Sequence, residues 1–426
     1  MSIEHKAMAA TAFSKRGFLA RITHLAACFA LFAASSALAQ TPHWVGSWMA
    51  SPCAPADAEP RRDQLSLNGD TVRQIVHLSI GGVAVRLHFS NTFGTAPLLI
   101  RSVRVAAAGK GSEIAGDGDK AATFSGKPEV SIAPGESVVS DAVNLPANAD
   151  GNLAVSFFVP EKVTAPAVHY TALQTSWVAP GEQTSAAELK GAHKITVDLI
   201  LTAVDVASRT SPGAIVALGS STTDGAHSTP NANHRWTDFL AERLRTTDAA
   251  NAPAVLNAGI SGNRVLNDGR GAWGPIFGES ALKRFHRDVL AQSGLKWIFV
   301  FEGGNDIRQA AGNPEVIQPQ QLIKAFQLMA REAHARKLKL IVATITPSQG
   351  TNPKDETPAW EATRLEVNKW ILTTKDIDGA VDFDKAAADP QRPARLLPAY
   401  DSGDHLHPND AGYKAMGESI DLHLFQ

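Results

Sequence analysis

The alternation of strand-like and helix-like segments after residue 213 constrains the fold of this chain most strongly. Short apolar runs typical of buried strands occur near residues 214–218, 254–257, 297–301, 339–344 and 379–381. Helical periodicity separates and follows them near residues 235–246, 279–292, 319–337, 359–373 and 408–423. Strands that alternate with helices form a parallel sheet with helices on both faces. We therefore predict an α/β domain of three layers, α/β/α, with flavodoxin-like strand order over residues 213–426.

Residues 41–207 show short alternating runs and many turn residues, without a helical period. The runs 72–80 and 83–89 are separated by Gly81-Gly82, which predicts a β-hairpin. Seven residues are expected to face one core: Val76, Leu78, Ile80, Val83, Val85, Leu87 and Phe89. Further strands are expected near 97–106, 129–132, 137–142, 152–159, 167–173 and 195–204. This pattern predicts an all-β sandwich domain, jelly-roll-like, that ends before a boundary at 208–213.

Residues 1–39 have the features of a cleavable export signal. Basic residues, among them Arg16 and Arg21, precede an apolar segment at 25–34, and Ala37-Leu38-Ala39 fits a cleavage site. We expect a periplasmic or secreted protein. A lipoprotein signal ending at Cys28 and a twin-arginine variant at Lys15-Arg16 remain alternatives, and both also lead to export. The apolar segment is shorter than the roughly 20 residues of a membrane span, so we expect no stable membrane insertion.

Composition and charge exclude several classes of function. The 426 residues are 44% hydrophobic and 19% charged, as in soluble globular proteins, and a net charge of −2 gives no footprint for nucleic acid. Removal of Cys28 with the signal leaves only Cys53, which excludes an intrachain disulfide and a thiolate metal site. His227 and His234 flank a polar loop, but no further ligand residues stand at a convincing spacing. The residues therefore give no convincing metal site.

Ser221 stands where the first strand of the predicted parallel sheet ends. Gly219-Ser220-Ser221 closes the apolar run 215–218, and a helix is expected directly afterwards. Such a turn lies at the carboxyl end of a strand, where open α/β sheets bind their ligands. The first backbone N–H groups of the helix can hold an oxyanion. The alternative is that the serines and threonines of 220–223 only cap the helix.

Three further polar stretches accompany Ser221 at predicted loop positions. They are residues 257–264, 303–306 and 404–408. His407 is a candidate base for the serine hydroxyl, because imidazole titrates near neutrality, and Asp404 can hold its other ring nitrogen. The backbone N–H groups of Ser221 and Gly262 and the side-chain amide of Asn305 are suitable donors to an oxyanion. Together these residues predict nucleophilic catalysis of acyl transfer.

These four stretches, in this order, resemble the Ser, Gly, Asn and His blocks of the SGNH/GDSL hydrolase superfamily. Ser221, Gly262, Asn305 and His407 stand at the matching positions. The β-rich first half resembles the N-terminal sandwich of some exported bacterial members. The resemblance implies a carboxylic ester hydrolase that works through an acyl-enzyme, without a metal or organic cofactor.

The resemblance also implies a role for each residue. Ser221 attacks, His407 shuttles the proton, Asp404 orients His407, and Ser221, Gly262 and Asn305 form the oxyanion hole. The sequence departs from the family at Ser220, where the family usually has Asp. This change is expected to alter loop rigidity or rate without abolishing activity.

The residues beside these blocks have supporting roles in this interpretation. Asp306 and Arg264 are expected to brace the oxyanion loops, and Asp224 to brace the turn after Ser221. His405 either competes for Asp404 or is a solvated loop residue. Two sets of aromatic residues either line binding surfaces or belong to the core. They are Trp273, Phe277 and Trp360 near the predicted pocket, and Trp44, Trp48 and Trp177 in the first half.

The expected function is that of an exported serine esterase that removes short acyl groups, above all acetyl, from carbohydrates. Its substrate would be a small-molecule or polysaccharide ester. A lipase, a lysophospholipase or an arylesterase with the same triad is an alternative. An inactive carbohydrate-binding protein, with Ser220 as the mark of decay, is an alternative from another class. The sequence leaves the natural ester, the oligomeric state and the export route open.

Overall fold

The computed structural model describes residues 41–56, 62–116, 118–308, 317–351 and 358–426. Residues 42–426 form one compact unit, which is not divided at 207–213, so a separate domain boundary there stays a prediction. The predicted signal, residues 1–39, lies outside the described residues. Among the described helices, none has the length and apolar character that a membrane span requires.

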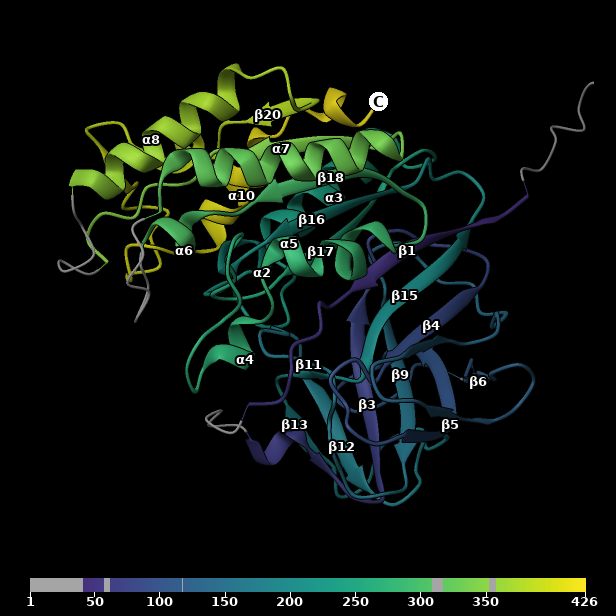
Figure 1. Ribbon diagram of the computed structural model, residues 1–426. Coiled ribbons are helices and arrows are strands. Elements are labelled where there is room, and N and C mark those ends of the chain that lie inside the picture. Colours follow the sequence, from purple (N-terminus) through teal and green to yellow (C-terminus); the bar gives the residue numbers. More distant parts are fainter. Residues whose placement is uncertain (1–40, 57–61, 117, 309–316, 352–357) are drawn as a thin grey trace, which may run out of the picture. The chain divides into compact units, whose positions relative to one another are not determined.

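Antiparallel strands make up the first half of the described chain (Figure 1). Their bounds are β1 His43–Met49, β2 Ser66–Leu67, β3 Asp70–His77, β4 Val85–Ser90, β5 Leu98–Ala107, β6 Lys120–Ala121, β7 Glu129–Ile132, β8 Ser137–Val139, β9 Asn152–Val159, β10 Val163–Thr164, β11 Val168–His169, β12 Ser176–Pro180, β13 His193–Ile195, β14 Asp198–Leu199 and β15 Leu201–Ser208, and a 3₁₀ turn, η1, spans Arg62–Leu65. One sheet has the order β1-β15-β4-β8, and a larger sheet has the order β13-β12-β3-β9-β5-β6, with β7 also on β5. The predicted antiparallel first half is therefore confirmed.

The predicted hairpin between residues 72–80 and 83–89 is wrong. β3 and β4 belong to different sheets, and Gly81-Gly82 crosses between them. The N–H of Gly82 donates to the carbonyl of Ala147 at 3.0 Å, and a Cβ on Gly81 would lie 2.5 Å from that same oxygen. The two glycines thus allow a close approach of backbones in place of a two-residue turn. The other predicted core residues of both runs are buried, but Val83, beside the crossover, is 43% exposed.

A five-stranded parallel sheet with helices forms the second half. The strands are β16 Ala214–Gly219, β17 Ala254–Gly259, β18 Leu295–Phe301, β19 Lys339–Ala343 and β20 Gly379–Val381. The helices are α2 Ser221–Asp224, α3 Trp236–Thr247, α4 Gly274–Phe277, α5 Ala281–Arg284, α6 Gly304–Ile307, α7 Pro319–Ala335, α8 Pro358–Thr373, α9 Phe383–Ala387 and α10 Asp410–Ser419. Smaller elements are a π-helical segment η2 at Phe285–Leu290, a 3₁₀ turn η3 at Leu422–Phe425 and the short strands β21 Ala388–Asp389 and β22 Arg392–Leu396. The strand order β17-β16-β18-β19-β20 confirms the flavodoxin-like prediction.

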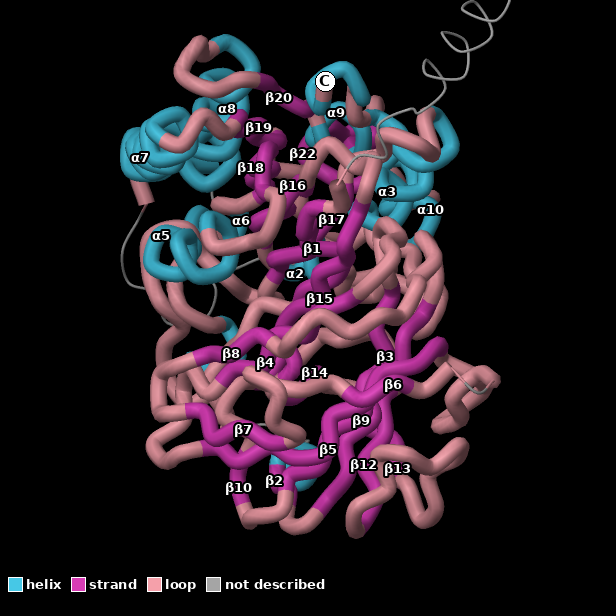
Figure 2. The backbone as a smooth tube through the Cα atoms, turned by 90° about the vertical axis from the view of Figure 1, so that its right-hand side faces the viewer, coloured by secondary structure: helices cyan, strands magenta, loops and turns pink. Residues whose placement is uncertain are grey.

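The parallel sheet lies between two helical layers. Figure 2 shows α7 and α8 on one side of the strands and α3 and α10 on the other. Alternate side chains of β16 serve two cores: Val216 and Leu218 join the core shared with the antiparallel sheets, whereas Ile215 and Ala217 join the core under α3 and α10. A strand buried on both faces explains the continuous apolar run in the sequence. The antiparallel half thus packs directly on the sheet that carries Ser221.

Candidate active site

Ser221 is the first residue of α2, at the carboxyl end of β16. The chain can turn this sharply because residue 219 is glycine: a Cβ there would lie 2.0 Å from Oγ1 of Thr223. Ser220 precedes the helix, but its side chain makes no capping hydrogen bond. The alternative that the residue before the helix serves only as a helix cap is therefore wrong for Ser220. The N–H of Ser221, at the start of the helix, has no partner within the helix and is available to an oxyanion.

The structure brings Ser221, His407 and Asp404 together, although 186 positions separate the first two. Oγ of Ser221 lies 2.7 Å from Nε2 of His407, and Nδ1 of His407 lies 2.6 Å from Oδ2 of Asp404. Because Nδ1 faces a carboxylate, it carries the proton of the neutral imidazole, and Nε2 is left as an acceptor. A hydroxyl, an imidazole and a carboxylate in this order are the parts of an activated serine nucleophile.

Asp404 is held in its ionised form. Burial alone raises its pKa, but hydrogen bonds from the His407 side chain and from the backbone N–H groups of His407 and Leu406 outweigh it. The two backbone bonds, both to Oδ1, are 2.8 Å and 2.9 Å long. The pKa of Asp404 therefore lies well below its ordinary value. An ionised Asp404 fixes the His407 tautomer and stabilises an imidazolium there.

The loop that carries Asp404 and His407 is fixed at both of its ends. Ser402 donates its N–H to the carbonyl of His407 at 3.0 Å, and Asp401 and Pro408 form a β-bridge. Asn409 then caps α10, since its side chain accepts the N–H of Gly412. A loop held in this way keeps the imidazole in place without a long helix or strand on either side.

The three predicted oxyanion donors follow the carboxyl ends of three neighbouring strands, β16, β17 and β18, at the same edge of the sheet. Gly262 has a left-handed backbone, with φ of 79°, and a Cβ on it would lie 2.2 Å from the ring of Phe277. Asn305, in α6, donates one side-chain N–H to the carbonyl of Asn263 at 2.9 Å. An amide has a second N–H, which is left for a ligand. Ser221 and Asn305 line the same pocket.

Asp224 ties α2 to the Gly262 loop and to the antiparallel half. Its Oδ2 accepts the N–H and the hydroxyl of Ser261, at 2.8 Å and 2.7 Å, and its Oδ1 lies 2.9 Å from Nε2 of His169 in β11. Burial opposes charge on both groups, but their mutual attraction lowers the pKa of Asp224 and raises that of His169. Asp224 therefore braces the turn after Ser221, and in addition its ion pair with His169 links that turn to β11.

Asp306 also acts as the expected brace. Its carboxylate accepts the N–H groups of Val265 and Leu266, at 2.8 Å and 3.0 Å, directly after the Gly262 loop. Burial raises the pKa of Asp306 to about 6 in spite of these bonds. Arg264 is buried in the same region.

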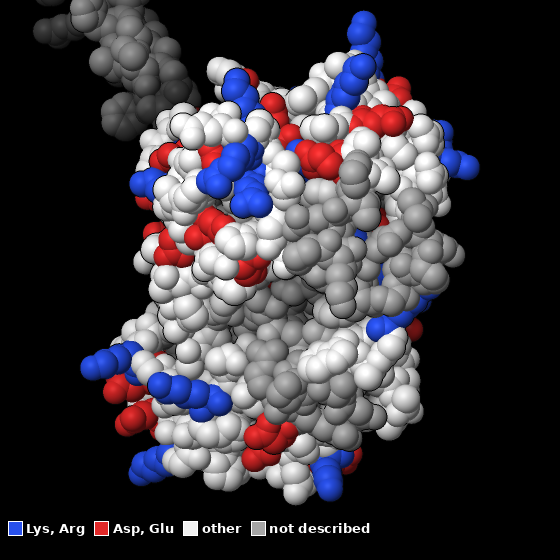
Figure 3. Space-filling view, turned by 90° about the vertical axis from the view of Figure 1, so that its left-hand side faces the viewer, with Lys and Arg blue, Asp and Glu red and all other residues white. Residues whose placement is uncertain are grey.

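The pocket next to Ser221 has an empty volume of about 490 Å³, part of it open to solvent. Its apolar lining is Phe301, Ile307, Ile345, Trp360 and Leu406, and its polar lining is Ser220, Ser221, Thr222, Glu302, Gly304, Asn305, Arg308, Thr346, Ser348 and Arg364. On the face shown in Figure 3, Lys and Arg side chains and Asp and Glu side chains both occur on the described surface. The described surface of this face therefore carries no single sign of charge that would favour a charged substrate.

Glu302 in this pocket was not predicted from the sequence. It is buried, and burial followed by repulsion from Asp306 raises its pKa well above the ordinary value, whereas the Ser220 hydroxyl lowers it in part. A carboxyl group therefore stands beside the turn where the usual Asp is replaced by Ser220. In the sequence, only its position immediately before the 303–306 stretch could have pointed to Glu302 as a residue of the site.

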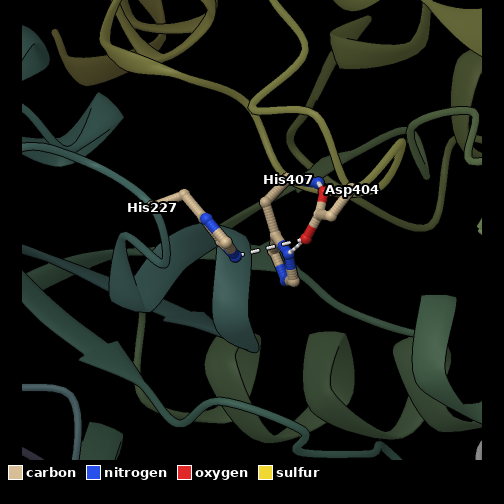
Figure 4. A group of neighbouring side chains, drawn as sticks. All are labelled: His227, Asp404 and His407. Carbon is tan, nitrogen blue, oxygen red and sulfur yellow. Dashed lines mark hydrogen bonds and ion pairs between the residues drawn. The ribbon is translucent and has the colours of Figure 1, made fainter.

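His227 is a second residue that the sequence did not assign. Its Nε2 lies 3.2 Å from Oδ2 of Asp404, and its ring stacks on His407 with centroids 5.2 Å apart (Figure 4). His234 similarly meets Asp410, at 2.7 Å. The partners of these two histidines come from the C-terminal loop and α10, far along the sequence, so spacing within the loop could not reveal them.

His405 does not compete for Asp404. Its Nδ1 lies 2.6 Å from Oδ2 of Asp401, and its side chain is 54% exposed. Of the aromatic residues near the pocket, Trp360 lines it, Phe277 packs on Gly262 and Trp273 is 46% exposed.

The tryptophans of the antiparallel half do not share one surface feature. Trp44 stacks under Arg86 and Trp177 under Lys194. Trp48 lines a second hollow of about 730 Å³, which lies between β1, β3 and α3 and is partly open to solvent. Asp224 reaches this hollow, but Ser221 does not line it.

Comparison with known proteins identifies the second half. The model of the GDSL-like lipase/acylhydrolase family matches residues 217–415. No curated protein matches the chain. Three solved structures are similar to it, each at low identity. A GDSL-like lipase from Bacteroides thetaiotaomicron is 20% identical, over 50% of this chain and 87% of that one, with a TM-score of 0.36. A lipase/acylhydrolase from Enterococcus faecalis is 19% identical, over 50% and 93%, with a TM-score of 0.37. A variant of an acetyl xylan esterase from Geobacillus stearothermophilus is 20% identical, over 50% and 93%, with a TM-score of 0.36.

Proposed function

Since residues 217–415 belong to the GDSL-like lipase/acylhydrolase family, and the chain is therefore a carboxylic ester hydrolase, we propose that it removes short acyl groups, above all acetyl, from carbohydrates outside the cytoplasm. The observation that carries the catalytic part is the continuous chain of hydrogen bonds from Ser221 through His407 to Asp404. Ser221 is the proposed nucleophile.

The proposed reaction passes through an acyl-enzyme. Nε2 of His407 takes the proton of Ser221 as Oγ attacks the ester carbonyl, and ionised Asp404 stabilises the imidazolium that results. The N–H groups of Ser221 and Gly262 and the Asn305 amide hold the oxyanion. His407 then gives its proton to the departing alcohol. Water, activated by the same imidazole, hydrolyses the acyl-enzyme and restores Ser221.

The chemistry of the pocket supports a short acyl group. Trp360 and Leu406 offer apolar surface near Ser221, but Glu302 and Arg364 line the same pocket. A long alkyl chain would cover the Glu302 carboxyl without giving it a hydrogen bond, which is unfavourable. The Arg364 guanidinium already has protein partners. An acetyl or a similarly small group avoids this cost. A lipase with the same triad would need a longer apolar channel.

The carbohydrate part of the proposal depends on the expected export signal, which would place the enzyme among extracellular polysaccharides. Neutral sugar esters also agree with the mixed charges of the described surface in Figure 3.

A fluorophosphonate probe tests the nucleophile. It should label the purified chain on Ser221, as peptide mass spectrometry can locate, and Ser221→Ala should remove the label. A p-nitrophenyl ester series should show kcat/KM highest for acetate and lower for each longer chain. Acetylated xylan and a phospholipid then separate the sugar esterase from the lipase. No label, together with binding of unmodified polysaccharide, would instead favour an inactive carbohydrate-binding protein.

A further inference from the structure

Three potential metal ligands from two distant loops meet beside the nucleophile. His227 comes from the loop after α2, and Asp404 and His407 come from the loop before α10. One ligand atom of each residue lies within 4.8 Å of the others. The described chain closes this cluster on the solvent side only in part, since the side chains of His227 and Asp404 are 50% and 33% exposed. An ion from solvent can therefore reach it.

The loop that carries His227 is held in place, which keeps its imidazole close to the other two potential ligands. Thr229 donates its N–H and hydroxyl to the carboxylate of Asp410 at the start of α10, and His234 also contacts that carboxylate. The carbonyl of Ala226 accepts the hydroxyl of Tyr413, at 2.6 Å. His227 itself has a left-handed backbone, with φ of 67°. These contacts hold its imidazole over the ring of His407.

We propose that His227, Asp404 and His407 form a binding site for Zn²⁺ whose occupation switches hydrolysis off. Two imidazoles and a carboxylate are a ligand set that zinc accepts, with a fourth position left for water. Zinc bonds of about 2.0–2.2 Å place tetrahedral ligand atoms roughly 3.3 Å apart. His227 Nε2 and Asp404 Oδ2 already stand 3.2 Å apart. Nδ1 of His407, now 2.6 Å from Asp404, has to move away by about 0.7 Å, and the two stacked imidazoles have to turn so that a nitrogen of each faces the ion.

Zinc binding and catalysis use the same nitrogen in incompatible ways. In the resting site Nδ1 of His407 carries the proton and Nε2 accepts the Ser221 hydroxyl. A metal on Nδ1 displaces that proton, which moves to Nε2 of the same ring, so no proton leaves the protein. Nε2 is then a donor and can no longer take the proton of Ser221. The metal also withdraws Asp404 from its role as partner to the imidazolium.

The pattern of inhibition follows from where the ligands lie. His227, Asp404 and His407 are not among the residues that line the pocket beside Ser221. Zinc should therefore lower kcat and leave KM for a small ester nearly unchanged. A competitive pattern, with KM rising and kcat constant, would contradict the proposal.

The test uses the full chain, treated with a chelator and transferred to metal-free buffer. Zinc sulfate is titrated while hydrolysis of p-nitrophenyl acetate is followed, and binding is measured separately by calorimetry. We expect one zinc ion per chain and inhibition that follows binding and is reversed by EDTA. In His227→Gln, half-saturation should need about 10-fold more zinc or more, because even indirect partners contribute about 10- to 100-fold to metal affinity.

His234→Gln is the matched control, because the glutamine amide can still donate to the Asp410 carboxylate and so keep the contact that helps to hold the loop. His234 is also a half-exposed histidine of the same loop, 41% exposed and paired with a carboxylate, but it lies outside the cluster. This variant should bind zinc and be inhibited like the wild type. Equal zinc affinity in wild type and His227→Gln, or an equal loss in His234→Gln, would overturn the site. Binding without inhibition would overturn the switch. Calorimetry does not need turnover, so it tests the site even if the proposed esterase activity fails.

Discussion

Two aspartate–histidine pairs lie at the two ends of α2, and they differ in what surrounds them. Asp404 and His407 meet at 2.6 Å beside Ser221, with side chains that are 33% and 13% exposed. Asp224 and His169 meet at 2.9 Å, with side chains that are only 3% and 9% exposed. In the first pair the free imidazole nitrogen faces a hydroxyl, whereas in the second pair Nδ1 of His169 faces the carbonyl of Ser51.

The comparison shows that the same two side chains serve catalysis where they are partly exposed and stabilise the fold where they are buried. His407 can pass a proton on, because a nucleophile and a pocket adjoin it. His169 has both nitrogens occupied and does not line the pocket beside Ser221, so its charge instead ties β11 to α2. Through Ser261, that second pair also holds the Gly262 loop. Four predictions test this division, from the largest expected effect to the smallest.

Loss of Ser221 or of His407, the two residues between which the proton passes, should nearly abolish turnover. Ser221→Ala and His407→Ala should each lower kcat by about 10⁴- to 10⁶-fold, and the double variant should be no worse, because the residues act as one unit. Initial rates on p-nitrophenyl acetate measure this, with folding checked by circular dichroism. Modest losses that add up in the double variant would contradict the assignment.

Loss of the buried pair should act on stability first. His169→Leu leaves the Asp224 carboxylate buried without its partner and should lower the free energy of unfolding by about 3–5 kcal/mol. Urea denaturation measures it. His234→Leu breaks a partly exposed pair with Asp410 and should cost about 1 kcal/mol or less. Equal stability of the two variants would contradict the buried ion pair by which Asp224 and His169 link α2 to β11.

Loss of one oxyanion donor should affect rate more than stability. Asn305→Ala should lower kcat by about 10²- to 10³-fold, since one such donor contributes about 2.7–4 kcal/mol to transition-state stabilisation. Among the described residues, the side chain of Asn305 gives up one hydrogen bond in the resting protein, to the carbonyl of Asn263. Kinetics and thermal unfolding of the same preparation separate the two effects. A large fall in melting temperature with an unchanged kcat would assign Asn305 to the structure alone.

The smallest effect concerns pH and the carboxyl of Asp198, which faces the buried pair. Burial raises its pKa to about 6, although His169 and Arg235 lower it. The folded chain therefore keeps this proton at pH values where the unfolded chain has lost it. Stability should fall as pH rises from about 4 to about 6, because the unfolded state binds fewer protons in that range. Asp198→Asn should flatten this slope in urea denaturation, and an unchanged slope would contradict the raised pKa.

Much of the second half could be read from local patterns. Each strand of the parallel sheet showed as a short apolar run, because side chains buried on both faces leave no room for polar alternation. Ser221, Gly262, Asn305 and His407 were found because loops after strands carry functional groups. The first half was harder: Gly81-Gly82 has the local signature of a hairpin, and only the position of Ala147 shows that it is a crossover.

By itself, the sequence determined the alternation of strands and helices, the polar residues that follow the strands and the chemistry those residues can perform. Only the tertiary structure decided that His227 meets Asp404, that His169 meets Asp224 and that Glu302 stands beside Ser220. The physical reason is the distance along the sequence over which each effect acts. Periodicity and residue chemistry act over a few positions, whereas each of these pairs joins segments that only the packing of two sheets and their loops brings within contact distance.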